Sequence, residues 1–274
     1  MGGTAASGMI CVVGDLNLDV VVCSSQPVAE ETDTDVHTWV GAGGQAANVA
    51  AWVVALGGRA RLVAARAADP AGGLVADELG RRGVDLAGPV LAGRTGVVVS
   101  LSDGGNTRSM LTDRGVGPHL RAAALRSAWF GGCTRLHLPA YSLVAAPIRD
   151  AALAAAGYVP RLSVDLSSTA ALRGYGIGRF RELLARLRPD IVFGNEAEAG
   201  LVGELAGDVP GADLVVKLGA RGVRAGGVHY PALPTRAVDS TGAGDAFAAG
   251  YLLGGVSLGL RAAARAVAKM GAMP

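Results

Sequence analysis

The chain has 274 residues, which is enough for one large α/β domain or two small ones. Half of the residues are hydrophobic but only 4% are aromatic, so the core must consist mainly of Ala, Val and Leu, and a net charge of +2 without basic blocks excludes nucleic acid as an expected partner. Three scattered cysteines, no leader pattern and no run of eighteen apolar residues argue against a disulfide framework, a zinc site and a membrane partner, and they predict a cytoplasmic protein.

The first half of the chain predicts the start of an α/β sheet together with extra strands. The expected elements are, in order, strands at 9–14, 20–23 and 36–40, a helix at 45–58, a strand at 60–65 and a helix at 72–84. Residues 95–113 contain two strand patterns around a Gly-rich turn, which indicates a hairpin. We expect the extra strands and the hairpin to form a small β lid, drawn from about 18–41 and 95–113.

The second half alternates regularly between strand and helix patterns. The expected elements are a strand at 134–140, a helix at 141–157, a strand at 160–166, a helix at 178–188, a strand at 190–195, a helix at 196–204, two strands within 212–227, and helices at 242–255 and 260–272. Such alternation predicts a parallel sheet covered on both faces. No linker rich in Pro or Ser interrupts it, so residues 1–274 are expected to form a single domain with a lid.

Two glycine strings compete for a role in ligand binding. The first, "GAGGQAANVAAW" at 41–52, is close to a dinucleotide-binding fingerprint. However, it comes some thirty residues after the first strand, and no acidic residue follows at a strand end in the place where a ribose would be bound. A dinucleotide oxidoreductase is therefore the weaker interpretation.

The second string, "DSTGAGDAF" at 239–247, opens the helix predicted at 242–255. Gly242 and Gly244, with Ala243 between them, let backbone N–H groups point into a cavity at the positive end of a helix. An aspartate near a helix start is a common capping choice, but capping does not require Gly-Ala-Gly before it. Phosphoryl transfer to an alcohol requires a base beside an anion site, so Asp245 is the predicted base and the amides of 242–244 are the predicted anion site.

These strings resemble the two signatures of the ribokinase-like (PfkB) carbohydrate kinase family. "DSTGAGDAF" is similar to the family's C-terminal signature, "GAGGQAANVA" is similar to its N-terminal glycine signature, and the resemblance covers nearly the whole chain. It implies a ribokinase-like three-layer α/β sandwich with a central, mostly parallel sheet and a small β lid. It also implies ATP as donor, Mg²⁺ as cofactor, often K⁺ or another monovalent cation, and a small-molecule acceptor, the hydroxymethyl of a sugar or nucleoside.

The resemblance assigns the acceptor to Asn17, Asp19, Gly43, Gly44 and Asn48. The spacing of Asn17 and Asp19 places both side chains on one face of an extended segment, which suits a polyol, although the residues alone also fit a turn. Ribokinases proper typically have Lys where this chain has Gln45, and this departure puts ribose as the substrate in doubt. Arg108 and Arg114 in the hairpin would approach an anionic substrate, although solvated charges are commoner in a lid.

The resemblance assigns the donor side to Asn195, Lys217, Gly219 and Gly222, with Glu198 near Mg²⁺ through water, and Asp239 and Thr241 beside a monovalent cation. Taken alone, Asn195 and Glu198 fit a helix cap equally well, and a surface role is the usual one for a lysine. The chain ends at "KMGAMP", where relatives often continue with further cation ligands, so the need for K⁺ is left open.

An ATP-dependent kinase acting on a primary hydroxyl of a sugar is the function that these patterns favour. A nucleoside kinase of the adenosine, inosine or pseudouridine type is the alternative, with Trp39 or Tyr141 available to stack on a base. A non-catalytic sugar or nucleotide sensor is disfavoured, because it has no need of Asp245. Relatives often dimerise through their lids, so we expect a homodimer with Val21, Trp39 and Val98 near the shared surface.

Overall fold

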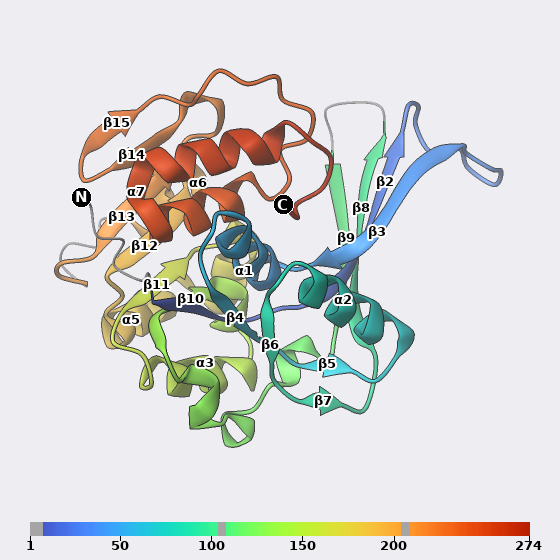
Figure 1. Ribbon diagram of the computed structural model, residues 1–274. Coiled ribbons are helices and arrows are strands. Elements are labelled where there is room, and N and C mark those ends of the chain that lie inside the picture. Colours follow the sequence, from blue (N-terminus) through green and yellow to red (C-terminus); the bar gives the residue numbers. More distant parts are fainter. Residues whose placement is uncertain (1–7, 104–107, 204–208) are drawn as a thin grey trace.

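A nine-stranded sheet runs through the computed structural model, which describes residues 8–103, 108–203 and 209–274 (Figure 1). Its strands are β1 (Met9–Val13), β4 (Ala60–Val63), β6 (Asp85–Ala87), β10 (Cys133–Pro139), β11 (Leu162–Asp165), β12 (Ile191–Asn195), β13 (Asp213–Lys217), β14 (Val223–Ala225) and β15 (Val228–Tyr230). They lie in the order β15-β14-β13-β12-β11-β10-β1-β4-β6. Every pair from β13 to β6 is parallel, and only β14 and β15 are added antiparallel. The mostly parallel sheet expected from the sequence is confirmed.

Helices cover both faces of this sheet (Figure 1). They are α1 (Gln45–Ala55), α2 (Pro70–Arg81), α3 (Ile148–Ala156), α4 (Thr169–Tyr175), α5 (Ile177–Leu187), α6 (Glu196–Val202) and α7 (Ala243–Val267), with short 3-10 turns at Gly117–His119, Ala122–Ala124, Ser127–Phe130, Ala140–Ser142 and Gly219–Arg221. Strand β1 is buried on both sides because its side chains alternate between two cores. Cys11 and Val13 pack in the core that includes α3 and α5, whereas Ile10 and Val12 pack in the core with α1 and α7.

The lid is a separate four-stranded sheet on one side of the main sheet (Figure 1). Its strands are β2 (Asn17–Ser24), β3 (Val36–Gly43), β8 (Thr95–Asp103) and β9 (Arg108–Gly115), in the order β3-β2-β8-β9, and a minor two-stranded sheet joins β5 (Arg66–Ala67) to β7 (Val90–Leu91). The central pair β2 and β8 is parallel, and the outer pairs are antiparallel. The Gly-rich hairpin turn at 104–107 lies outside the described residues.

The register of the lid strands fixes which side chains share a face. Asp19 pairs with Gly41 on β3 and with Val98 on β8, and Val98 in turn pairs with Thr112 on β9. Asp19, Val98 and Thr112 all line a cleft between the lid and the main sheet. Alternate residues of β2 therefore face the cleft, as the spacing of Asn17 and Asp19 predicts.

Helices α3, α4 and α6 differ from the sequence-based expectation. The helix expected at 141–157 begins only at Ile148, because Pro147 lacks an N–H and restricts the residue before it. Helix α4 was not expected, although Ser168 caps it by accepting a hydrogen bond from the Ala171 amide (3.3 Å). The helix expected at 196–204 ends at Val202 among the described residues.

The last helix, α7, joins the two final helices expected but ends at Val267, before the expected end at 272, and it is broken at Gly254 and Gly255, where the backbone is non-helical. By length and composition alone it resembles a membrane span. In the fold, however, its alanines pack with α1 in the core of the domain. The indole N–H of Trp52 in α1 donates to the Ala272 carbonyl (2.8 Å), which ties the segment after α7 to the same core.

Candidate active site

A cleft of about 470 Å³ lies between the lid and the carboxyl ends of the parallel strands. Each central strand delivers a polar residue to it: Asp15 follows β1, Tyr141 follows β10, Asp165 ends β11, Asn195 ends β12 and Lys217 ends β13. Open α/β sheets bind their ligands at this edge, because the helix starts and loops that follow the strands converge there. Residues of both glycine strings, 41–52 and 239–247, meet in this cleft.

The cleft brings together most of the residues predicted from the sequence. Those that line it are Asn17, Asp19, Gly44, Asn48, Asn195, Glu198, Lys217, Gly219, Thr241, Gly242, Gly244 and Asp245. Gly43, Gly222, Asp239 and Ala243 are not part of its lining. Gly222 has a positive φ of 100°, and a Cβ there would lie 2.0 Å from the Tyr230 carbonyl oxygen, so this glycine serves the close packing of a turn.

The start of α7 forms one wall of the cleft. Gly242 precedes the helix in the left-handed conformation (φ 70°), and a Cβ on it would lie 2.6 Å from the backbone of Ala272. No side chain caps this helix start among the residues described. The Ala243 amide donates to the Ser240 carbonyl (3.3 Å), so the anion site predicted from 242–244 depends on the amides that follow Ala243 and on the helix dipole.

Asp245 lies in the first turn of α7 and accepts a hydrogen bond from the side-chain amide of Asn48 in α1 (2.8 Å). Burial raises the pKa of Asp245 to about 7, and the Asn48 hydrogen bond opposes this rise. A carboxylate with a pKa near neutrality can both take up a proton and release it again at the pH of a cell. This is the property that a general base requires.

Three side-chain oxygens in the cleft are buried and accept no hydrogen bond from any described residue: Asn17 Oδ1, Gln45 Oε1 and Asn48 Oδ1. Buried oxygens without a partner are costly, so such groups normally have a donor in the functional state. Hydroxyl groups of a bound polyol would supply these donors. Asp15 does not share this role, because its carboxylate caps α1 by accepting from the Gln45 and Ala46 amides (3.1 and 3.0 Å).

Two glycines allow the acceptor side chains their positions. A Cβ on Gly43 would lie 2.0 Å from Cγ of Asp19, and a Cβ on Gly96 would lie 2.3 Å from Oδ1 of Asn17. The space of each missing side chain is therefore filled by a polar group of β2. Although Gly43 does not itself line the cleft, it is required for the placement of Asp19.

On the donor side, Asn195 and Glu198 form a reciprocal capping box at the start of α6. Asn195 Oδ1 accepts from the Glu198 amide, and Glu198 Oε2 accepts from the Asn195 amide, both at 2.9 Å. Burial raises the pKa of Glu198, whose side chain lines the cleft. Asn195 and Glu198 therefore both cap α6 and line the cleft.

No cluster of three or more His, Cys, Asp or Glu side chains able to hold a metal occurs within 8–103, 108–203 and 209–274. Mg²⁺ keeps several waters and uses substrate phosphates as ligands, so a single carboxylate such as Glu198 fits a contact through water. In the loop before α7, Asp239 accepts from the Thr241 amide and hydroxyl and from the Gly271 amide. These bonds close the loop onto the C-terminal segment.

Comparison with known proteins decides the family. The model of the pfkB family carbohydrate kinases matches residues 7–273 of this chain. The chain belongs to the pfkB family. Members of this family are phosphotransferases that act on sugars or nucleosides.

Relatives of this pfkB kinase include proteins of differing substrate. It is 31% identical over 223 residues to an ATP-dependent ribose-1-phosphate kinase from Halopiger xanaduensis, covering 77% of this chain and 72% of the relative. Its fold matches an adenosine kinase from Sinorhizobium meliloti with a TM-score of 0.85 (24% identity, 98% and 96% of the two chains). It also matches a putative ribokinase II from E. coli in complex with ATP and Mg²⁺, with a TM-score of 0.82 (21% identity, 96% and 94%). Both solved structures share its ribokinase-like fold.

The most consequential residue of the cleft that the sequence analysis of this pfkB kinase did not predict is Asp165. Asp165 lines the cleft at the end of β11, and its carboxylate accepts from the Lys217 ammonium (2.7 Å). The signal available in the sequence was a lone acidic residue closing an apolar strand. Lys217, a residue type that is usually on the surface, has only 17% of its side chain exposed.

We predict that Gly43→Ala disables acceptor use while nucleotide binding is retained, because the new methyl group would displace the Asp19 carboxylate. The expected loss in kcat/KM for the acceptor is about tenfold or more, as for the removal of a charged hydrogen bond. Gly73→Ala is the matched control, because a Cβ there meets nothing within 4 Å and the position is helical. Equal kinetics for the two variants would show that Gly43 does not position Asp19.

Proposed function

We propose that this pfkB kinase transfers the γ-phosphoryl group of ATP to a primary hydroxyl of a sugar, with Asp245 as general base. The observation that carries the proposal is the Asp245 carboxylate, which lies at the start of α7 in the same cleft as three buried oxygens that accept no hydrogen bond from any described residue. The same group borders the positive end of a helix, where a transferred phosphoryl group would be stabilised.

The acceptor would be held between the lid and α1. Asn17 and Asn48 accept hydrogen bonds from sugar hydroxyls through the oxygens that no described residue donates to, and Asp19 offers a further carboxylate on the lid face that carries Asn17. Asn48 also donates to Asp245, so one side chain orients both the substrate and the base. Asp245 takes the proton of the attacking hydroxyl as the bond to phosphorus forms.

When bound, ATP supplies the phosphoryl group, and Mg²⁺ neutralises charge on its phosphates. The residues of this chain that would hold them line the same cleft: Lys217 at the end of β13, Gly219 in the turn after it, and Glu198 in α6 through water. The putative ribokinase II from E. coli, solved in complex with ATP and Mg²⁺, supports this choice of donor. The hydrogen bonds that Asp239 accepts from Thr241 and from the Gly271 amide account for closure of the loop without a cation, so K⁺ at Asp239 and Thr241 stays a prediction.

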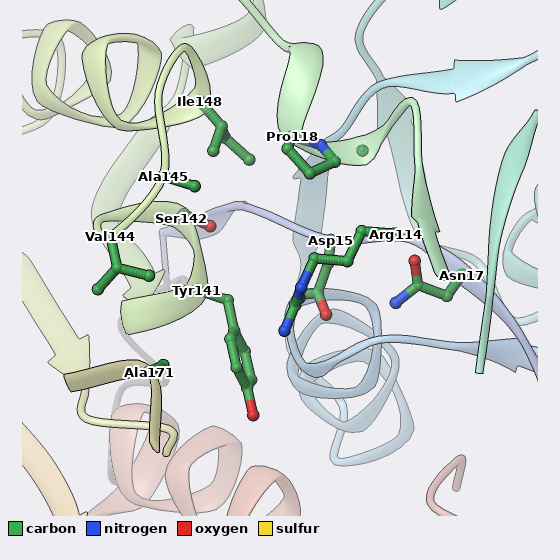
Figure 2. Close-up of a pocket in the computed structure, with 11 residues that line it drawn as sticks. Asp15, Asn17, Arg114, Pro118, Tyr141, Ser142, Val144, Ala145, Ile148 and Ala171 are labelled. Atoms are coloured by element: carbon green, nitrogen blue, oxygen red, sulfur yellow. The ribbon is translucent and has the colours of Figure 1, made fainter. Parts of the chain in front are cut away.

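A hollow of about 200 Å³ opens beside the acceptor cleft and shares Asp15, Asn17, Arg114 and Tyr141 with it (Figure 2). Arg114 lies over the Tyr141 ring, with its guanidinium carbon 4.4 Å from the ring centre. Arg114 forms no ion pair with a residue in the described part of the chain. A cation at the junction of the two spaces favours a sugar that carries an anionic group, such as ribose-1-phosphate, the substrate named for the relative from Halopiger xanaduensis.

A nucleoside is the second candidate acceptor, and the rest of the hollow favours it. Its far wall consists mainly of apolar side chains, among them Pro118, Val144 and Ile148 (Figure 2). A flat base attached to the sugar would stack on Tyr141 and displace water from this wall. Trp39, the other aromatic residue expected to stack, does not line either space.

Replacing Asp245 with Asn should lower kcat by about 10²–10⁴-fold while ATP binding persists, because the variant keeps the shape of the base and loses its proton affinity. In the unmodified protein, kcat/KM for the acceptor should fall as the pH drops below about 7, because the carboxylate with a pKa of about 7 becomes protonated and no longer accepts a proton. Turnover of Asp245→Asn within tenfold of the unmodified protein would rule out the base assignment.

A comparison of ribose, ribose-1-phosphate and adenosine as acceptors tests the substrate class. We expect ribose-1-phosphate to give the highest kcat/KM, and Arg114→Met to lower that value by about 10–100-fold while changing the value for ribose less than about threefold. Arg94→Met is the matched control, because Arg94 pairs with Asp113 outside the cleft. A tenfold preference for adenosine would favour the nucleoside kinase. A preference for free ribose would argue against binding of either a phosphate or a base in the hollow.

We also propose a homodimer formed through the lid. Both lid faces carry exposed apolar side chains, with Trp39 and Met110 on the cleft face and Val40 and Leu111 on the other, each about half exposed. Val98 is buried in the cleft, so the shared surface would form without it. Light scattering at tens of micromolar should report twice the mass of one chain, and a single-chain mass with both substrates present would contradict the proposal.

A further inference from the structure

A buried ion pair crosses the floor of the cleft. The Lys217 ammonium at the end of β13 donates to Asp165 at the end of β11 (2.7 Å), reaching across β12, which lies between the two strands. The Asp165 side chain is 1% exposed. A buried ion pair is weak support for stability, because desolvation of the two charges offsets much of their attraction. Its place in the wall of the cleft therefore suggests a role in binding or catalysis.

The position of the ammonium points to that role. A Cβ on Gly244 would lie 3.2 Å from Nζ of Lys217, so the ammonium rests against the first turn of α7. A helix start carries partial positive charge, and a cation placed there is repelled unless an anion binds both. The arrangement is that of an anion site in which the helix start and Lys217 act on the same ligand.

Carboxylates from several elements surround this ammonium. Burial lowers the pKa of Lys217, but Asp165, Glu198 and Asp245 outweigh burial, so that its pKa lies above the ordinary value. Lys217 is therefore charged throughout the working pH range. Of its neighbours, only Asp165 is in direct contact with Nζ among the residues described, and the direction of the ammonium depends on this bond.

We propose that Asp165 is a positioning residue that holds the Lys217 ammonium against the start of α7, where it neutralises the charge of the transferred phosphoryl group. The inference rests on the proposed kinase function and extends it by one residue. Asp165 itself makes no contact with the reacting atoms. It acts by positioning Lys217, and the charges of the Asp165–Lys217 pair also shift the pKa of Asp245.

The two members of the pair act in opposite directions on Asp245. Asp165 raises the pKa of Asp245, and Lys217 lowers it. The other charged groups that face Asp245 or share its cleft are Asp15 after β1, Asp19 on β2, Glu198 on α6 and Arg114 on β9. A substitution at Asp165 or Lys217 leaves these groups unchanged. A shift in the acidic limb of the kcat/KM–pH profile, where Asp245 becomes protonated, therefore reports on the Asp165–Lys217 ion pair.

The test compares Asp165→Asn, Lys217→Met and the double variant. Each single variant should lower kcat by about tenfold or more, with the acceptor KM within about threefold, and the double variant should lose no more than Lys217→Met alone. The acidic limb of the kcat/KM profile should move to lower pH in Asp165→Asn, to higher pH in Lys217→Met, and stay near its original position in the double variant. Multiplicative losses in the double variant, or unmoved limbs, would overturn the proposal.

A binding measurement separates failure of this inference from failure of the proposed function. By calorimetry, the single variants should bind a non-hydrolysable ATP analogue about tenfold more weakly while ADP binding changes less than about twofold, because the ammonium acts at the terminal phosphate. An unmodified protein that binds neither nucleotide would overturn the kinase proposal and the inference with it. Nucleotide binding that is equal in all variants would overturn the inference alone.

Two further variants complete the design. Asp85→Asn is the matched control, because Asp85 pairs with Arg61 (2.6 Å) far from the cleft and should leave kcat and the pH profile unchanged. Asp165→Asn is the variant with the greatest risk of misfolding, because it leaves the buried Lys217 ammonium without its partner. If it does not fold, the double variant compared with Lys217→Met still isolates the Asp165 charge, and identical acidic limbs in those two proteins would count against the proposal.

Discussion

The hydrogen bond from Asn48 to Asp245 joins the two halves of the site, and much of the remaining architecture serves to make it possible. The two residues are 197 positions apart, and each lies in the first turn of a helix, α1 or α7. These helices pack on the same face of the sheet through small buried side chains, mostly alanines. Small side chains let the helix axes approach closely, so the two helix starts meet at one edge of the sheet. A composition rich in Ala and poor in aromatic residues is thus consistent with the geometry of the site.

Closeness of backbone recurs on the lid side of the cleft. Asn17 and Asp19 occupy space that a side chain on Gly96 or Gly43 would fill, and Gly242 lies against the backbone of Ala272. The C-terminal segment that contains Ala272 is held by the indole of Trp52. The polar side chains of Asn17 and Asp19 therefore depend for their positions on the missing side chains of neighbouring glycines as much as on hydrogen bonds. Any added methyl group at these contacts requires a shift of the groups that bind the ligand.

Charge in the cleft is divided among carboxylates with separate tasks. Asp15 caps α1, Glu198 caps α6, and Asp165 binds Lys217. Asp245 combines burial, a hydrogen bond from the neutral amide of Asn48 and a pKa near 7. Burial favours its protonated form, while the nearby ammonium of Lys217 favours the ionised form, and the balance leaves it able to exchange a proton at neutral pH.

The sequence by itself determined the fold class, the lid and most of the residues that line the cleft. The alternation of apolar strands with helix patterns reflects local periodicity, and the string around Asp245 combines backbone freedom with a helix start, so both are visible without any contact between distant residues. The spacing of Asn17 and Asp19 likewise fixed their common face, because side chains of a strand alternate strictly.

Only the tertiary structure decided which of these groups act on one another. In the sequence, Asp165 is an aspartate at the end of an apolar strand and Lys217 resembles a surface lysine, so neither indicates an ion pair. The strand order places β11 and β13 on either side of β12 and brings the two side chains together. The resemblance assigns Gly222 to the donor side, yet its backbone packs against Tyr230 and is not part of the cleft lining. The hollow beside Arg114 and Tyr141 arises where the lid meets the segment after β10. Pairing, burial and pKa depend on distances between residues far apart in the chain, and those distances are set by the packing of the whole domain.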